Sequence, residues 1–248
     1  MLRFFRRIRK GLLESGASRK YILYAMGEVL LVMVGILLAL QVNNWNEWKK
    51  DRAREKEILN ELLLTVEQNL MAMEEDVQRR MNWNRSSDIV ISTIENDAAY
   101  SDTLNLHFQN ARIPGTNLAL SNAGYEGLKN AGYEIIRSKE LRNNIIQLFE
   151  VVQRNLQEEM EYFESFQPDR QRFTDELFSY EEEKFDPDSP FTVPIEPHNF
   201  DDLKDNKTYL AMVKSVKVQR SIIGVHLNRL MSESNRILRI LKSKTGSE

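Results

Sequence analysis

Glu28 is the residue whose type and position most suggest chemistry, because it lies within an apolar stretch, residues 21–42. In a helix it lies roughly 10 Å along the axis from Tyr21, at the standard rise per residue. A carboxylate inside a bilayer is costly unless it is protonated, paired or able to reach the interface. Glu28 is therefore either a proton or cation relay or a group that hydrogen-bonds a partner helix or reaches the headgroups. We favour the second role, because no other charged residue in the stretch completes a relay.

Small and polar residues follow Glu28 on the same face of a helix. Gly35 is seven positions on, Ala39 eleven and Asn46 eighteen. Gly35 and Ala39 form a small-x-x-x-small pattern, which lets two helix backbones approach closely. We therefore predict that Glu28, Gly35, Ala39 and Asn46 form one face for contact between membrane helices.

The sequence shows little sign of catalytic or cofactor chemistry. The chain has no cysteine, which excludes disulfides, zinc–thiolate sites and thiol catalysis. Its three histidines, His107, His198 and His226, are scattered. It contains no glycine-rich phosphate loop, HExxH motif or nucleophile elbow. We therefore expect a protein that is not an enzyme and that has no metal or cofactor.

The element that positions Glu28 is a predicted transmembrane helix, residues 21–42. About 20 apolar residues cross the hydrocarbon core of a bilayer. Tyr21 and Tyr24 lie at one end, and Trp45 and Trp48 lie just past the other, where interfacial aromatic belts are found. A secretory signal peptide is the competing interpretation, but Leu40 to Trp45 makes a poor cleavage site. We predict a signal anchor that is retained.

The predicted orientation of this helix follows from its basic flanks. Residues 1–20 are predicted to form a basic amphipathic leader, with a basic face of Arg3, Arg6, Arg7, Arg9 and Lys10. It is either a helix that lies on the cytoplasmic leaflet or a positive-inside signal with some hydrophobic residues, and the two interpretations are compatible. The other flank is also basic, through Lys49, Lys50, Arg52, Arg54 and Lys56, so the bias is modest. It favours a cytoplasmic N-terminus and a large domain outside the cytoplasm.

Residues 43–102 are predicted to continue the membrane helix, because no glycine or proline occurs between Gly35 and Pro114. An apolar seam of alternating four- and three-residue steps runs through Leu59, Leu63, Val66, Leu70, Met73 and Val77. Arg80 and Asn84 interrupt it after fewer than three heptads. The pattern therefore indicates a helix of a bundle rather than a long coiled coil.

Residues 103–248 are predicted to supply the remaining helices of an all-α extracytoplasmic bundle. Residues 103–116 show no periodic pattern, and residues 185–201 are predicted to form an irregular loop. Periodicity and turn signals predict four helices, over 117–132, 138–166, 170–184 and 206–242. A short repeat places Tyr125 and Tyr133 in equivalent positions; we expect core tyrosines rather than a ligand pocket.

Charge is unevenly distributed in the C-terminal part, within a net charge of -3. Residues 154–188 are acidic and the last helix is basic, which predicts that the two pair within the bundle. Aromatic residues do not interleave with the basic ones as stacking platforms for nucleic acid require, so we expect no nucleic-acid partner.

Two stretches resemble a family of uncharacterised bacterial single-pass inner-membrane proteins, a domain of unknown function. Lys20 to Glu47 carries a Gly27-Glu28 pair and an Asn43-Asn44-Trp45-Asn46 exit after the basic leader. Tyr125-Glu-Gly-Leu-Lys129 through Leu141-Arg142 is a looser match. The resemblance implies a bacterial inner-membrane protein with a periplasmic C-terminal domain, but it supplies no activity.

The sequence favours a membrane-anchored interaction or scaffold protein. Its expected partners are the lipid bilayer and either further copies of itself or other membrane proteins. Two alternatives are an ion-coupled subunit that uses Glu28 and a sensor whose outer domain binds a small ligand. The sensor lacks a recognisable cytoplasmic output domain, since only residues 1–20 lie inside.

Overall fold

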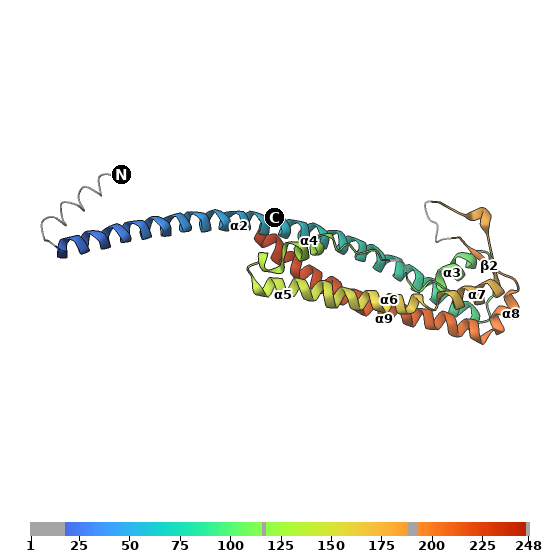
Figure 1. Ribbon diagram of the computed structural model, residues 1–248. Coiled ribbons are helices and arrows are strands. Elements are labelled where there is room, and N and C mark those ends of the chain that lie inside the picture. The colour runs from blue at the N-terminus through green and yellow to red at the C-terminus, as the bar shows by residue number, and fades with distance from the viewer. Residues whose placement is uncertain (1–17, 116–117, 188–192, 247–248) are drawn as a thin grey trace. The chain divides into compact units, whose positions relative to one another are not determined.

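The computed structural model describes residues 18–115, 118–187 and 193–246. These residues are mostly helical, which confirms the all-α prediction (Figure 1). The chain divides into two compact units, 1–55 and 56–248. The predicted basic face of the leader, Arg3, Arg6, Arg7, Arg9 and Lys10, lies outside the described residues.

The longest element is α2, a 78-residue helix over Ser18–Glu95. It includes the predicted membrane segment and most of the helix predicted to follow it. The absence of proline, and of glycine after Gly35, leaves no helix breaker inside it. It ends at Glu95, one residue before the predicted range of ends, Asn96 to Asp102, and Asp97 then adopts a positive φ of 50°.

The body contains seven further α-helices among its described residues, α3 Leu104–Ala111, α4 Ala123–Ala131, α5 Lys139–Gln147, α6 Arg154–Glu164, α7 Gln167–Leu177, α8 Phe200–Asp205 and α9 Lys207–Thr245. A π-helical turn over Leu148–Gln153 joins α5 to α6. Ser138 and Asn206 begin α5 and α9 because their side chains accept backbone hydrogen bonds from Leu141 and Tyr209.

Several predicted boundaries are wrong. Helix α3 lies in the segment predicted to be patternless, and α4 begins at Ala123 rather than near Asn117. The helix predicted over 170–184 ends at Leu177, where β1 (Phe178–Tyr180) pairs antiparallel with β2 (Ile195–Pro197). The pairing buries Phe178 and Ile195, and this long-range gain overrides local helix propensity. Part of the predicted 185–201 loop is therefore a strand, followed by α8.

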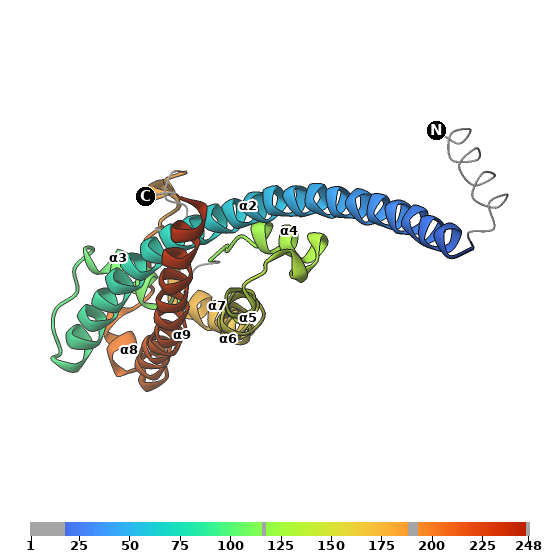
Figure 2. The ribbon, with the colours of Figure 1, turned by 90° about the vertical axis from the view of Figure 1, so that its left-hand side faces the viewer.

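The body has two apolar clusters. The first joins residues 58–73 of α2 to α4, α5, α6 and residues 223–241 of α9. Figure 2 shows α4 between α2 and α5. The second joins Val90 and Ile94 of α2 to α3, the two strands, α8 and the start of α9, and Phe108, Phe178 and Tyr209 pack together in it.

A polar layer lies along α2 and α9 between these clusters. Asp76, Arg80 and Ser87 of α2 are buried, and so is Arg220 of α9. These residues occupy the stretch where the apolar seam of α2 stops in the sequence. The interruption therefore marks a buried polar contact, not a turn of the helix toward solvent.

The basic residues of α9 pair chiefly with α2. Lys214 Nζ lies 2.6 Å from Glu95 Oε1, and Lys242 Nζ lies 2.9 Å from Glu67 Oε1. Lys217 pairs with Asp88 of α2. Helix α6, which lies in the acidic segment 154–188, packs against α9, so the acidic and basic helices are neighbours as predicted. These three lysines nevertheless form their ion pairs with α2 and not with that segment.

Candidate functional site

The predicted membrane-helix face lies open along the first part of α2. Gly35, Ala39 and Asn46 are exposed and Glu28 is half-buried. A Cβ built on Gly35 meets nothing within 4 Å. Helical geometry places the four residues on one face, and no described residue of the first unit blocks the close approach of a second helix there.

The predicted interfacial aromatics lie in the same helix. Trp45 is 58% exposed and Trp48 is 45% exposed, while Tyr24 is half-buried. Lys49 Nζ lies 3.8 Å from the centroid of the Trp45 ring, a cation–π contact. Tyr21 lies in the first turn of α2. The tryptophans and Lys49 thus form an amphipathic exit at the C-terminal end of the apolar segment.

Among the described residues, α2 is the one helix long and apolar enough to cross a membrane, judged by length and composition. None of its most apolar stretch is buried by the rest of the protein. Its large apolar side chains, such as Leu31 at 73% exposed, have no protein core to enter. A soluble protein rarely exposes so long an apolar surface.

The two repeat tyrosines meet each other in the body. Their hydroxyl oxygens are 3.1 Å apart, and Tyr125 also donates to Glu150 Oε1 at 3.0 Å. The Tyr125 ring stacks on Phe149, with centroids 4.7 Å apart. Burial, with these two hydrogen bonds, raises the pKa of Tyr125. This buried, neutral phenol acts as a packing group, as the sequence predicted.

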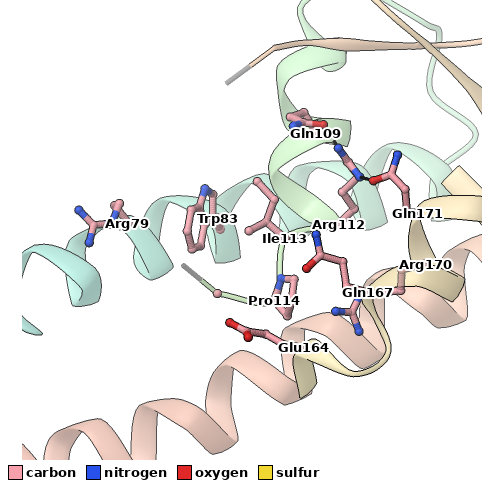
Figure 3. Close-up of a pocket in the computed structure, with 11 residues that line it drawn as sticks. Arg79, Trp83, Gln109, Arg112, Ile113, Pro114, Glu164, Gln167, Arg170 and Gln171 are labelled. Atoms are coloured by element: carbon pink, nitrogen blue, oxygen red, sulfur yellow. Dashed lines mark hydrogen bonds between the residues drawn. The ribbon is translucent and has the colours of Figure 1, made fainter. Parts of the chain in front are cut away.

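A cavity of about 480 Å³ opens in the body where α2, α3 and the α6–α7 junction meet (Figure 3). Helix α2 contributes Arg79 and Trp83. The C-terminal end of α3 and its exit contribute Gln109, Arg112, Ile113, Pro114 and Gly115, and the α6–α7 junction contributes Glu164, Gln167, Arg170 and Gln171. Arginine and glutamine therefore dominate the lining.

Arg112 is held in this cavity by two glutamines. Its Nε donates to Gln109 Oε1 and its Nη1 donates to Gln171 Oε1, both at 2.8 Å (Figure 3). Gln171 is oriented in turn, because its Nε2 donates to Asp175 at 2.7 Å and to the Tyr180 hydroxyl at 2.6 Å. The position of the Arg112 guanidinium is thus fixed by an ordered network.

Arg170 and Arg79 lie on other parts of the wall. Arg170 Nη2 donates to the Phe163 carbonyl oxygen at 3.0 Å, and burial lowers the pKa of Arg170 from its usual value. Arg79 is 43% exposed at its side chain and lies 3.7 Å from Glu75. These arginines therefore present positive charge to the cavity from α7 and α2.

A fourth arginine lies behind the cavity wall. A Cβ on Gly115 would lie 2.9 Å from both Nη atoms of Arg80, so a larger residue there would require the guanidinium to move. Arg80 Nε pairs with Asp76, and Nη1 donates to the Pro114 carbonyl oxygen at 3.2 Å. Its buried Nη2 has no hydrogen-bond partner among the described residues.

A second concavity, of about 570 Å³, is mainly apolar and lies on the surface of α6, α7 and α9. Tyr162, Phe166, Val218 and Ile222 are its exposed apolar side chains. Groups of three or more histidine and acidic side chains suited to a metal ion are not found in the described ranges.

Sequence reasoning missed the arginines of the cavity. Arg79, Arg112 and Arg170 are far apart in the chain and follow no common spacing. The nearest signal is the Pro114-Gly115 pair, which lies in the segment predicted to be patternless and carried no predicted role. Only the packing of α2, α3 and α7 brings these residues together.

No protein-family model, curated protein or solved structure matches this chain. The resemblance of Lys20–Glu47 and Tyr125–Arg142 to a family of bacterial inner-membrane proteins therefore stays a prediction from the sequence.

Proposed function

We propose that the protein is a membrane-anchored interaction protein. In this proposal α2 crosses the bacterial inner membrane once, with the N-terminus in the cytoplasm and the helical body in the periplasm. The observation that carries it is the apolar stretch of α2, which is long enough to span a bilayer and has none of its surface buried by protein.

The proposed mode of interaction is helix association through the face of Glu28, Gly35 and Ala39. In a bilayer, close packing and interhelical hydrogen bonds drive association, because lipid tails are as apolar as the helix. The open space at Gly35 allows close approach, and Glu28 can hydrogen-bond across the contact. The partner helix is a second copy of the chain or a helix of another membrane protein.

The exposed apolar side chains of the body support an interaction role at a second level. Tyr162, Phe166, Val218 and Ile222 gather around one concavity on α6, α7 and α9. An apolar surface of this kind is common where proteins contact other proteins.

Membrane topology is tested by reporter fusion. A reporter active only outside the cytoplasm, fused after Lys244, is expected to be active. Activity of a cytoplasmic reporter alone at that position overturns the orientation. The mass of the mature protein is expected to retain residues 1–42, and a chain that starts near Asn43 identifies a cleaved signal peptide instead.

Self-association is tested by crosslinking, for which the cysteine-free sequence gives no background. Ala39→Cys lies on the proposed face, and Leu37→Cys lies on the opposite side of the same helix. Oxidation in membranes is expected to give disulfide dimers for Ala39→Cys and few for Leu37→Cys. Equal yields contradict a specific face. Absence of dimers, with a constant co-purifying chain in mild detergent, assigns the face to another protein.

The ion-coupled alternative depends on Glu28 alone. It predicts that a residue unable to titrate at this position removes function without changing assembly. Glu28→Gln, compared for function and for assembly, therefore separates the two roles of the same side chain.

A further inference from the structure

We infer that the arginine-lined cavity of the body binds a small organic dianion, either a phosphate monoester or a dicarboxylate. This inference goes beyond the proposed membrane role and does not depend on it. It rests on the charge of the lining, the ordering of Arg112, the size of the space and a buried nitrogen of Arg80 that has no hydrogen-bond partner in the part of the chain that the structure describes.

The charge of the lining favours a doubly charged anion. Arg79, Arg112 and Arg170 contribute three positive charges and Glu164 contributes one negative charge. The remaining polar side chains, Gln109, Gln167 and Gln171, are neutral. A ligand with two negative charges complements this wall, and guanidinium groups bind phosphate and carboxylate oxygens through paired N–H donors.

The geometry of Arg112 is that of a prepared binding group. Gln109 and Gln171 hold two of its nitrogens at 2.8 Å each, and Asp175 and Tyr180 hold Gln171. These contacts restrict the rotamers of a long side chain before a ligand arrives. A group that is already ordered loses less entropy on binding.

The fourth arginine, Arg80, has a buried hydrogen-bond donor without an acceptor among the described residues. Arg80 is 4% exposed, and its Nη2 has no partner among the described residues. Buried polar groups are rarely left without a partner, because the loss of water is costly. Gly115, against which this guanidinium packs, lines the cavity, so the Nη2 donor lies next to the proposed site.

The size and the remaining wall point to an organic ligand rather than a bare ion. About 480 Å³ lies within the range typical of small-molecule sites. Trp83, Ile113 and Pro114 provide apolar surface beside the arginines (Figure 3). A ligand with a planar or apolar body between or beside its charges uses both kinds of surface.

The test is calorimetric titration of the full chain, purified in mild detergent, with defined probes. Phenyl phosphate and inorganic phosphate form one arm, and succinate, glutarate and adipate form the other. Glutaramide is the uncharged control. At least one dianion is expected to saturate, to bind at least about tenfold more tightly than glutaramide, and to weaken with salt. The arm that binds more tightly identifies the chemical class.

Variants separate the cavity from nonspecific charge. Arg112→Gln is expected to weaken binding about tenfold or more, because it removes charge-assisted hydrogen bonds. Arg79→Gln is expected to weaken binding severalfold without unfolding, because Arg79 is partly exposed. Arg229→Gln, at an exposed position of α9 outside the lining, is the matched control. If no dianion binds at millimolar concentration, or if Arg229→Gln weakens binding as much as Arg79→Gln, the inference is wrong.

Discussion

Arg220 of α9 donates from Nη1 to the side-chain oxygen of Asn84 on α2, at 3.1 Å. Asn84 is one of the two residues that interrupt the apolar seam in the sequence. Arg220 also donates to the Ser87 hydroxyl and to the carbonyl oxygens of Asn110, Ala111 and Ile113, at 2.8–2.9 Å. All five guanidinium N–H groups are therefore satisfied, and the C-terminal end of α3 receives a positively charged cap.

The charge state of this arginine suits its role. Burial, with repulsion from Arg80, lowers the pKa of Arg220 to about 9. The guanidinium is therefore protonated at neutral pH, and each of its donors is available. One buried side chain thus joins α2, α3 and α9 between the two apolar clusters.

Replacement of Arg220 is expected to destabilise the body strongly. Arg220→Leu leaves the α3 carbonyl oxygens and two α2 side chains without their donor, at a cost of about 3 kcal/mol or more. Arg220→Lys keeps the positive charge but has fewer hydrogen-bond donors, so its loss of stability is expected to be smaller than that of Arg220→Leu. Thermal denaturation of the full chain measures both.

The control for this series is Arg229→Leu, at an exposed position on the same helix. It is expected to change the free energy of unfolding by less than about 0.5 kcal/mol. If the Arg220 and Arg229 variants lose similar amounts of unfolding free energy, the interhelical hydrogen bonds of Arg220 contribute little to stability.

Two glycines of the body are expected to respond oppositely to alanine. A Cβ on Gly124 of α4 would lie 2.6 Å from the backbone oxygen of Glu61 in α2, whereas a Cβ on Gly224 of α9 meets nothing within 4 Å. Gly124→Ala is expected to destabilise by about 1–3 kcal/mol through overpacking. Gly224→Ala is expected to stabilise by about 0.5–1 kcal/mol through helix propensity.

Denaturation of the two variants side by side tests this pair. Equal and small effects indicate that α4 can shift away from α2 without cost. That result contradicts the tight backbone contact at Gly124.

Substitutions in the membrane helix distinguish contact from proton transfer. If Glu28 is a contact group, Glu28→Gln is expected to be mild, because the amide keeps hydrogen-bonding capacity. Gly35→Leu is expected to be worse, because its bulk separates the backbones. For a proton carrier the order reverses, and Glu28→Gln abolishes function while assembly is intact. Crosslinking in membranes measures assembly, and a growth phenotype measures function. If both variants assemble and function normally, this helix acts only as a membrane anchor.

Acidification is expected to destabilise the body through His107. Its Nδ1 lies 3.1 Å from the Ser86 hydroxyl oxygen, and burial, with repulsion from Arg85, lowers the pKa of His107 from 6.5. The unfolded chain therefore takes up the proton at higher pH than the folded chain does. Stability is full above pH 6.5 and falls as the pH drops toward the lowered folded value.

The comparison that isolates this residue uses His107→Asn. The melting temperature is measured at about pH 7.5 and about pH 5, on either side of the usual histidine range. The melting temperature of the wild-type chain is expected to fall further between these two pH values than that of the variant, because all other groups titrate equally in both. An identical loss assigns the acid sensitivity to other groups.

Local signals in the sequence were sufficient for the long helices, but not for α3, the two strands, α8 or several helix ends in the C-terminal part. The absence of helix breakers predicted the long α2, and periodicity with turn signals placed the starts of α5 and α9 within one residue. Residues 170–184 read locally as helix, yet Phe178 leaves the helix to pair with β2. That pairing depends on Ile195 and Pro197, which no local window includes.

The sequence by itself determined the long helix, its apolar segment and the point where its seam stops, because periodicity, length and composition are local properties. The tertiary structure alone decided what fills that interruption and what surrounds the cavity. Arg220 reaches carbonyl oxygens more than 100 positions earlier in the chain, and Arg79, Arg112 and Arg170 converge from three helices. The sequence does not distinguish a buried arginine from an exposed one. Only the packing of distant segments determines which oxygen atoms each guanidinium binds and which of them line a cavity.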